Sequence, residues 1–164
     1  MSRSMTTRIR IQQQDFDLAE EYQLLRQSES AVGAVVTFCG LVRDFELNVD
    51  GAESIDSLNL QHYPGMTESL LESIVEEANQ RWDLIAITVI HRVGNLAPSE
   101  QIVLVGVASQ HRADAFESAQ FLMDYLKTQA TFWKSVTGNG KQQWIESKAS
   151  DQQAAARWDG SGDE

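Results

Sequence analysis

The chain has 164 residues, 42% of them hydrophobic, which is long enough for one domain with a substantial core. Its 13 Lys and Arg residues against 24 Asp and Glu residues give a net charge of −11, which argues against nucleic acid as a partner because phosphate neutralisation needs a basic face. No apolar run approaches the roughly 20 residues that cross a bilayer, and the N-terminus lacks the apolar region of a signal peptide, so we expect a cytoplasmic protein that does not enter membranes.

The first third of the chain predicts a strand, a helix and a second strand. Residues 7–12 alternate weakly between apolar and polar side chains, as in a short strand, and residues 17–27 predict a helix. Asp15 or Asp17 is the expected N-cap, because a short side-chain oxygen accepts hydrogen bonds from the free N–H groups of a first turn. Residues 31–42, AVGAVVTFCGLV, are rich in β-branched side chains and predict a buried strand.

The middle of the chain continues this alternation. A polar loop over residues 45–54 leads to a half-buried strand over residues 55–63, and Thr67 opens an amphipathic helix after a Pro-Gly turn signal. Residues 84–93 and 101–109 predict two further apolar strands joined by a turn.

The last part predicts a long helix over residues 112–129 and a final strand over residues 141–147. Antiparallel strands interleaved with two long packed helices are typical of the α+β class. We expect a single domain over residues 1–158 and a disordered tail over residues 159–164, where the composition turns polar and Gly-rich.

Residues 111–134, HRADAFESAQFLMDYLKTQATFWK, depart from the acidic character of the chain. Residues 91–134 carry four Lys or Arg and four Asp or Glu side chains. Four cationic or protonatable side chains lie on or beside the predicted helix: His111, Arg112, Lys127 and Lys134. This local reversal of charge predicts a pocket for an anionic small molecule.

Lys127 continues a stripe that we expect to face the core, formed by Phe116, Ala119, Met123 and Leu126. A lysine in this position either extends its charged end into solvent or lies at the rim of an apolar cavity. In a cavity, desolvation favours a neutral amine that is available for acid–base or nucleophilic chemistry. Lys134 follows two aromatic residues, which would hold its ammonium near a ring-shaped ligand, unless it is simply a surface lysine.

Other basic side chains allow two interpretations. His111 and Arg112 precede a helix, whose N-terminus suits a phosphate or carboxylate, although His111 could simply cap the turn and Arg112 could pair with an acid. Arg43 ends a strand, where it either binds an anion or makes a surface ion pair. His62 and His91 end or interrupt strands and are predicted to be structural.

The single cysteine, Cys39, excludes an internal disulfide and a multi-cysteine metal site. It lies in an apolar run without an adjacent base, where burial favours an inert thiol. The histidines lack metal-binding spacing, and the sequence contains no P-loop, GxGxxG or GxSxG motif. We therefore expect no metal and no cofactor.

Five segments resemble the large, catalytic subunit of molybdopterin synthase: AVVTFCGLVRD, LQHYPGMTE, ITVIHRVGNLAPSE, VGVASQHRADAFESAQFLMDYLKTQATFWK and SDQQAAARW. The resemblance runs from about residue 33 to residue 158. It implies an α/β-hammerhead fold and the conversion of cyclic pyranopterin monophosphate (precursor Z) to molybdopterin, a step of molybdenum cofactor biosynthesis. The sulfur would come from the thiocarboxylated C-terminal Gly-Gly of a small ubiquitin-like subunit, in a heterotetramer built on a homodimer of large subunits.

By the same resemblance, the substrate-binding positions fall on Leu41, Val42, Arg43, His111, Arg112, Lys127, Lys134, Ser135 and Val136. Family members often carry a lysine where this chain has Leu41, so one possible cation is missing from the pocket. Lys148 matches a basic position, frequently arginine, that contacts the site of a neighbouring chain. A lysine there keeps the charge but loses bidentate geometry toward phosphate.

The residues and the resemblance lead to one hypothesis. Arg43, His111 and Arg112 bind the cyclic phosphate, whereas Lys127 is the general acid–base or holds the thiocarboxylate carbonyl during attack. Lys134 orients the pterin or the covalent intermediate.

Two alternatives stay open at this point. One is a non-catalytic acidic module that docks a ubiquitin-like partner, which is suggested only by Leu41. The other is a sulfurtransferase that carries a persulfide on Cys39.

Overall fold

The computed structural model describes residues 4–43, 57–129, 132–138, 141–145, 149–156 and 158–159. In chain order its elements are β1 (Thr6–Gln12), α1 (Leu18–Arg26), β2 (Ala34–Leu41), β3 (Ser57–His62), α2 (Met66–Arg81), β4 (Leu84–Arg92), β5 (Gly94–Leu96), β6 (Gln101–Ser109), α3 (Arg112–Gln129), β7 (Phe132–Gly138), β8 (Lys141–Ile145) and α4 (Ala149–Ala156). The predicted loop over residues 45–54, the basic position Lys148 and the tail beyond Asp159 lie outside the described residues.

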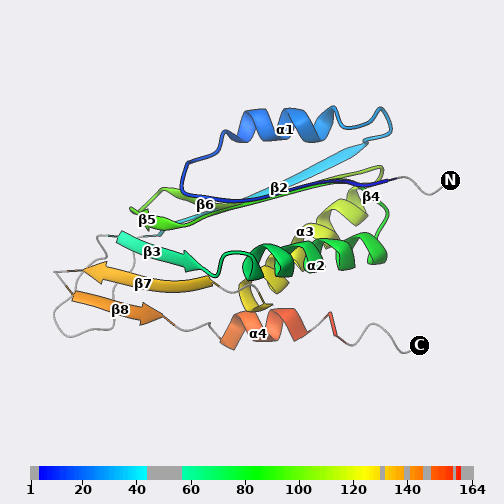
Figure 1. Ribbon diagram of the computed structural model, residues 1–164. Helices are drawn as coiled ribbons and strands as arrows, with labels where there is room; N and C mark the ends of the chain where they lie inside the picture. Colours follow the sequence, from blue (N-terminus) through cyan, green and yellow to red (C-terminus); the bar gives the residue numbers. More distant parts are fainter. Residues whose placement is uncertain are drawn as a thin grey trace.

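Two four-stranded sheets organise the fold. The first has the strand order β1-β4-β6-β2, and the second has the order β5-β3-β7-β8. Helix α1 covers one face of the first sheet, α2 and α3 cover the other, and the second sheet extends from one end of the first (Figure 1). Mixed helices and sheets confirm the α+β class. The strands are not all antiparallel, because β1 pairs with β4 in parallel.

The first sheet is buried between these helical layers, which explains its apolar sequence. All nine residues of β4 are buried, as expected for a central strand with both faces covered. The largest cluster of buried side chains joins β4 and β6 to α2 and α3. A smaller cluster around Leu25 holds α1 against the opposite face.

Two helix starts follow directly from local sequence. Asp17 is the N-cap of α1, since its Oδ1 accepts hydrogen bonds from the N–H groups of Ala19 at 2.9 Å and Glu20 at 3.2 Å. Helix α2 begins one residue before the predicted Thr67, after Gly65, whose φ of 85° favours glycine. The Glu68 carboxylate accepts a hydrogen bond from the Gly65 N–H at 2.6 Å and closes this first turn.

The predicted core stripe of α3 is wrong at its first member. Phe116 is 63% exposed, whereas Ala119, Met123 and Leu126 are buried. The stripe against the sheet is centred on Ala115, Ala119 and Leu122, and Phe116 lies about 100° around the helix from Ala115. Lys127 lies on the same flank as Phe116 and is exposed too.

Three elements were not predicted from the sequence: β5, β7 and α4. Strand β7 has a mixed sequence, FWKSVTG, and is ordered by antiparallel partners on both sides, β3 and β8. Helix α4 lacks an amphipathic pattern but packs on α3. Trp158, which follows α4 in the chain, donates its indole N–H to Asp124 Oδ2 of α3 at 2.7 Å. Tertiary pairing, rather than local sequence, therefore forms this part of the molecule.

Candidate active site

The predicted site residues divide between the two ends of α3. His111 and Arg112 stand at its start, and Lys127 lies in its last turn. Arg112 and Lys127 are separated by about 22 Å along the axis, at about 1.5 Å per residue. One copy of the chain therefore cannot place all the predicted cations around one small molecule.

Lys127 and Lys134 both lie near enough to a buried histidine for their charges to affect its pKa. His91 is only 4% exposed, and its ring stacks on Phe132 with 3.7 Å between the ring centroids and 14° between the planes. Burial, together with the nearby charges of Lys134, Lys127 and His62, lowers the pKa of His91 to about 3 despite a hydrogen bond to a backbone carbonyl. The imidazole is therefore neutral at physiological pH, and the two lysines supply the positive charge here.

Residues 41–43 lie at the same end of the molecule as His91 and the second sheet. Strand β2 runs antiparallel to β6, with Leu41 opposite Gln101 and an irregularity in the pairing after Gly40. The Val42 side chain packs in one buried cluster with Val136 and with Leu60, which pairs with Lys134. The ends of β2 and β7 therefore meet, and Arg43 follows at the exposed end of β2.

The other predicted substrate contacts differ in exposure. Leu41 is 53% exposed, so its apolar side chain is available to a ligand or another protein. Val42, Ser135 and Val136 are buried. Their substrate-binding role stays a prediction, and it would be exerted through the main chain.

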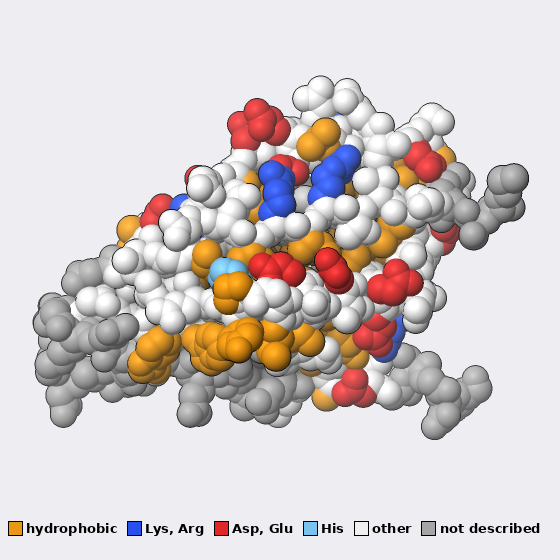
Figure 2. Space-filling model, viewed as in Figure 1, with side chains coloured by type: hydrophobic (Ala, Val, Ile, Leu, Met, Phe, Trp, Pro, Cys, Tyr) orange, Lys and Arg blue, Asp and Glu red, His pale blue; other side chains and the backbone are white. Residues whose placement is uncertain are grey.

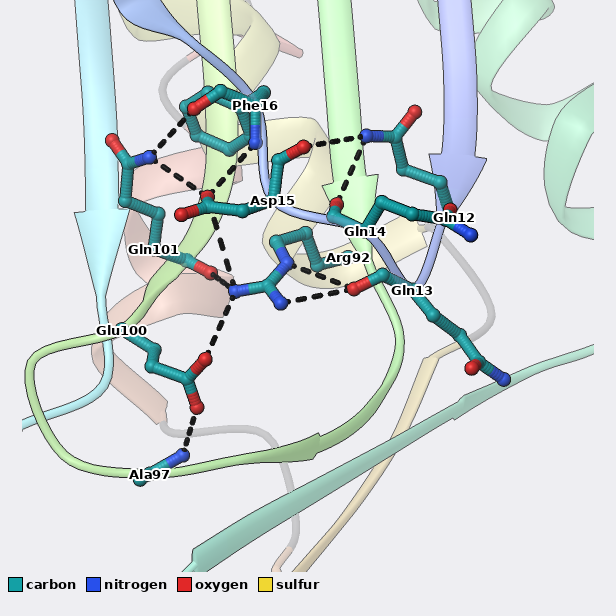
Figure 3. Close-up of polar contacts among 9 residues, drawn as sticks. All are labelled: Gln12, Gln13, Gln14, Asp15, Phe16, Arg92, Ala97, Glu100 and Gln101. Carbon is teal, nitrogen blue, oxygen red and sulfur yellow. Dashed lines mark hydrogen bonds and ion pairs between the residues drawn. The ribbon is translucent and has the colours of Figure 1, made fainter.

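A polar network around Arg92 supports the end of β2 (Figure 3). The guanidinium donates hydrogen bonds to the carbonyl oxygens of Gln13, at 3.1 and 2.9 Å, and Gln101, at 2.9 Å. It also lies 3.5 Å from the Glu100 carboxylate. The main chain of residues 99–100 in turn holds Val42, whose N–H donates to Glu100 O at 2.9 Å and whose carbonyl accepts from Ser99 N at 2.7 Å. Through the loop at residues 99–100, Arg92 thus stabilises the end of β2, which Arg43 follows.

Asp15 completes this network on its outer side. Its carboxylate accepts hydrogen bonds from the Gln101 side chain and the Phe16 N–H, both at 2.8 Å. These two hydrogen bonds and the positive charge of Arg92 hold the pKa of Asp15 below its usual value. Asp15 therefore stabilises the loop and is not the cap of α1.

His111 and Arg112 follow β6 at the far end of the sheet. The segment before β2 passes close to this point, because a Cβ on Gly33 would lie 2.3 Å from the carbonyl oxygen of Gln110. Both side chains are exposed. Within the described part of the chain, Arg112 makes no ion pair with an acid, so that interpretation finds no support.

Cys39 lies on the other face of the sheet from the lysines. It packs against Phe16, Ile90 and Leu104 beneath the α1 layer, and burial raises the pKa of its thiol. An inert thiol in this position does not serve the lysine site.

The other described residues do not add a metal site. Among the described residues, His, Cys, Asp and Glu do not gather into a group that could hold a metal ion. None of the described helices combines the length and apolar character needed to span a membrane.

An open depression on α2 is lined by Ser69, Glu72, Ser73, Glu76, Glu77 and Gln80. Its acidic lining repels an anionic substrate, and it contains no predicted site residue.

Large exposed hydrophobic side chains lie on the second sheet and on the segment that leads from it into α2. Tyr63, Met66, Trp133 and Trp144 are each 48–57% exposed, and Trp133 contacts Tyr63 edge-on at 6.3 Å. Hydrophobic side chains gather in a strip over β7 and β8, below the visible histidine (Figure 2). Exposed apolar surface of this extent is typical of protein contacts.

Comparison with known proteins gives consistent matches over almost the whole chain. The model of the family described as MoaE protein matches residues 11–129. The molybdopterin synthase catalytic subunit of Escherichia coli is 51% identical, over 93% of this chain and 98% of that protein.

Solved structures agree with the sequence matches. A molybdopterin biosynthesis MoaE protein from Burkholderia ambifaria is 44% identical, with a TM-score of 0.78 over 94% of this chain and 99% of that chain. A complex of subunits 1 and 2 of the molybdopterin-converting factor from Helicobacter pylori contains a chain that is 20% identical, with a TM-score of 0.68 over 85% of this chain and 91% of that one. At this identity the likeness concerns the fold alone.

Proposed function

The chain belongs to the MoaE protein family, and from that membership we propose that it is the catalytic subunit of a molybdopterin synthase, a sulfurtransferase. Its substrate is cyclic pyranopterin monophosphate. Its product is molybdopterin, whose dithiolene sulfurs come from the thiocarboxylated C-terminus of a small ubiquitin-like subunit. The reaction belongs to molybdenum cofactor biosynthesis in the cytoplasm.

The observation that carries this proposal is the pair of lysines around the neutral His91. Two cations near the same buried histidine, in a protein with a net charge of −11, favour an anionic occupant at this end. Lys127 serves as general acid–base or holds the thiocarboxylate carbonyl, and Lys134 orients the pterin or the covalent intermediate. Arg43, at the end of β2, binds the phosphate.

A second copy of the chain supplies the missing anion-binding groups. Because α3 lies against β2, the outer strand of its sheet, an exposed flank runs from Phe116 past β2 to Leu41. A two-fold contact along this flank is self-complementary and places the start of one α3 beside the end of the other. His111 and Arg112 of one copy then join Lys127 of its partner, which supports a homodimer.

The small subunit completes a heterotetramer. Trp133, exposed on the outer face of the second sheet, directly precedes Lys134. Adjacent residues of a strand point to opposite faces, so a subunit docked on the Trp133 side extends its anionic tail around the sheet to reach Lys134. The Helicobacter pylori protein of similar fold is itself in a complex of two subunits.

The direct test is to incubate the purified chain with cyclic pyranopterin monophosphate and thiocarboxylated small subunit, and to measure molybdopterin. Product should form at the expense of thiocarboxylate, and a small subunit with a plain carboxylate should give none. If thiocarboxylate is not consumed and no dithiolene appears, the assignment is wrong.

A further inference from the structure

His91 is the polar exception inside the most buried strand of the protein. It lies next to the end of β4, all of which is buried, on the face covered by α2 and α3. Its Nδ1 is 2.8 Å from the carbonyl oxygen of Arg92. Because a carbonyl oxygen can only accept, Nδ1 carries the hydrogen and donates, and the neutral ring keeps its lone pair on Nε2.

The stacked partner of His91 belongs to the segment that carries both lysines. Phe132 is the first residue of β7 and stands three positions after Gln129, the last residue of α3. Side chains two positions apart in a strand share a face, so Lys134 projects on the same side as Phe132. Lys127 lies one short turn before the end of α3. The stack therefore holds the chain between the two lysines against the end of the first sheet.

We propose that His91 is a positioning residue for the reaction: by donating to the Arg92 carbonyl and stacking on Phe132, it fixes Lys134 relative to Lys127. This inference rests on the proposed function of the two lysines. Histidine meets both requirements at once, since phenylalanine offers the flat ring without the donor and asparagine offers the donor without the ring. The neutral ring adds no positive charge between two cations.

Two variants separate the two contacts. His91→Asn keeps an amide N–H near the position of Nδ1 but loses the stack, whereas His91→Phe keeps an aromatic ring but loses the donor. Phe132→Leu removes the stack from the other side. The matched control is Ile85→Val, on the same strand but in the cluster beneath α1.

We expect kcat for molybdopterin formation to fall about a hundredfold in His91→Asn, the size associated with a displacement of about 1 Å, while KM for the pterin stays within about twofold. Phe132→Leu should give the same loss, and the double variant should be no worse than the poorer single one, because both changes remove one contact. Ile85→Val should lower stability and leave kcat unchanged.

A second measurement does not depend on turnover. Lysines labelled by reductive ¹³C-methylation, and assigned with Lys127→Arg and Lys134→Arg, give NMR signals that report their surroundings. The Lys134 signal should shift and broaden in His91→Asn but not in Ile85→Val. Unchanged signals and unchanged kcat in folded His91→Asn overturn the proposal. If His91→Asn does not fold, His91→Phe decides by the same two criteria. If the unmodified chain makes no product, the proposed function fails, and the NMR comparison still decides whether His91 positions the lysines.

Discussion

Arg112 and Lys127 stand at opposite ends of one helix, about 22 Å apart along its axis, although both are expected at the same small substrate. A continuous α-helix holds its two ends apart, and no proline interrupts the 18 residues of α3. A site that uses both residues therefore combines the start of one α3 with the end of another.

Mixing two inactive variants tests this shared site. Arg112→Ala and Lys127→Ala should each be inactive alone, but in a mixed dimer one site carries both substitutions and the other carries neither. After unfolding and refolding as an equal mixture, activity should return to about a quarter of the original level, as random pairing in a two-fold dimer requires. Molybdopterin formation provides the measurement. No recovery, in a mixture that forms mixed dimers, would place both residues in the same chain's site.

Lys127→Ala should preserve the fold, because the side chain is exposed and makes no ion pair within the described residues. Product formation should fall by a factor of about 100 to 10,000, as expected for loss of a general acid–base. Binding of the small subunit, measured by calorimetry, should remain. Arg26→Ala removes an exposed cation from α1 and serves as the control. Turnover comparable to the unmodified protein in Lys127→Ala contradicts the assigned role.

Arg43→Ala should act mainly on substrate binding. Loss of a charge-assisted hydrogen bond to phosphate costs about 1.5–3 kcal/mol, which raises KM about 10- to 100-fold with little change in kcat. Steady-state kinetics with varied pterin concentration separate the two constants. A fall in kcat at constant KM would instead mean that Arg43 acts on the transition state alone.

His91 should make the stability of the fold depend on pH. Its pKa in the folded protein, about 3, lies below the unfolded value of 6.5, so the unfolded chain binds the proton first as the pH falls. The stability is therefore complete above about pH 6.5 and decreases toward pH 3. Between pH 7 and pH 5 the free energy of unfolding should fall by about 2 kcal/mol on this account. Urea unfolding at both pH values gives this change for the unmodified protein and for His91→Phe. The change should be about 2 kcal/mol larger in the unmodified protein, and the two should be equal if the ring is protonated in the fold.

Cys39 should be dispensable for sulfur transfer. Its thiol packs beneath α1, and burial raises its pKa, so little thiolate exists at neutral pH. Cys39→Ser should retain molybdopterin formation, and iodoacetamide should modify the native protein slowly. Loss of activity in this variant, with the fold intact by circular dichroism, would favour a persulfide mechanism.

Local sequence was sufficient for the elements with strong patterns. The strand Gln101–Ser109 and the helix Arg112–Gln129 have the predicted bounds, because a continuous apolar run and a long helical pattern dominate their local preferences. Asp17 was one of two expected caps, and Asp15 proved to belong to the Arg92 network.

What the sequence could not provide were relationships between distant segments. The stacking of His91 on Phe132 depends on β7, a strand that forms only between β3 and β8. The available signal was a histidine inside the apolar run ITVIHRVG, but a buried polar residue alone does not identify its partner. The separation of the cations also needed the sheet, because β2 ends opposite Gln101 and so places Arg43 far from Arg112, which follows the other end of β6.

The edge strand β2 makes the newly synthesised chain prone to aggregation. Its sequence, AVVTFCGL, contains no charged residue or proline, and none of the described strands pairs with its outer edge, which only the irregularity after Gly40 disturbs. An unprotected edge strand can form backbone hydrogen bonds with an exposed strand of another chain. Natural proteins usually prevent this pairing with charged side chains on the edge strand. Before it is covered, the chain is therefore prone to aggregate. Its yield of soluble protein should depend on how fast assembly outcompetes that side reaction during synthesis.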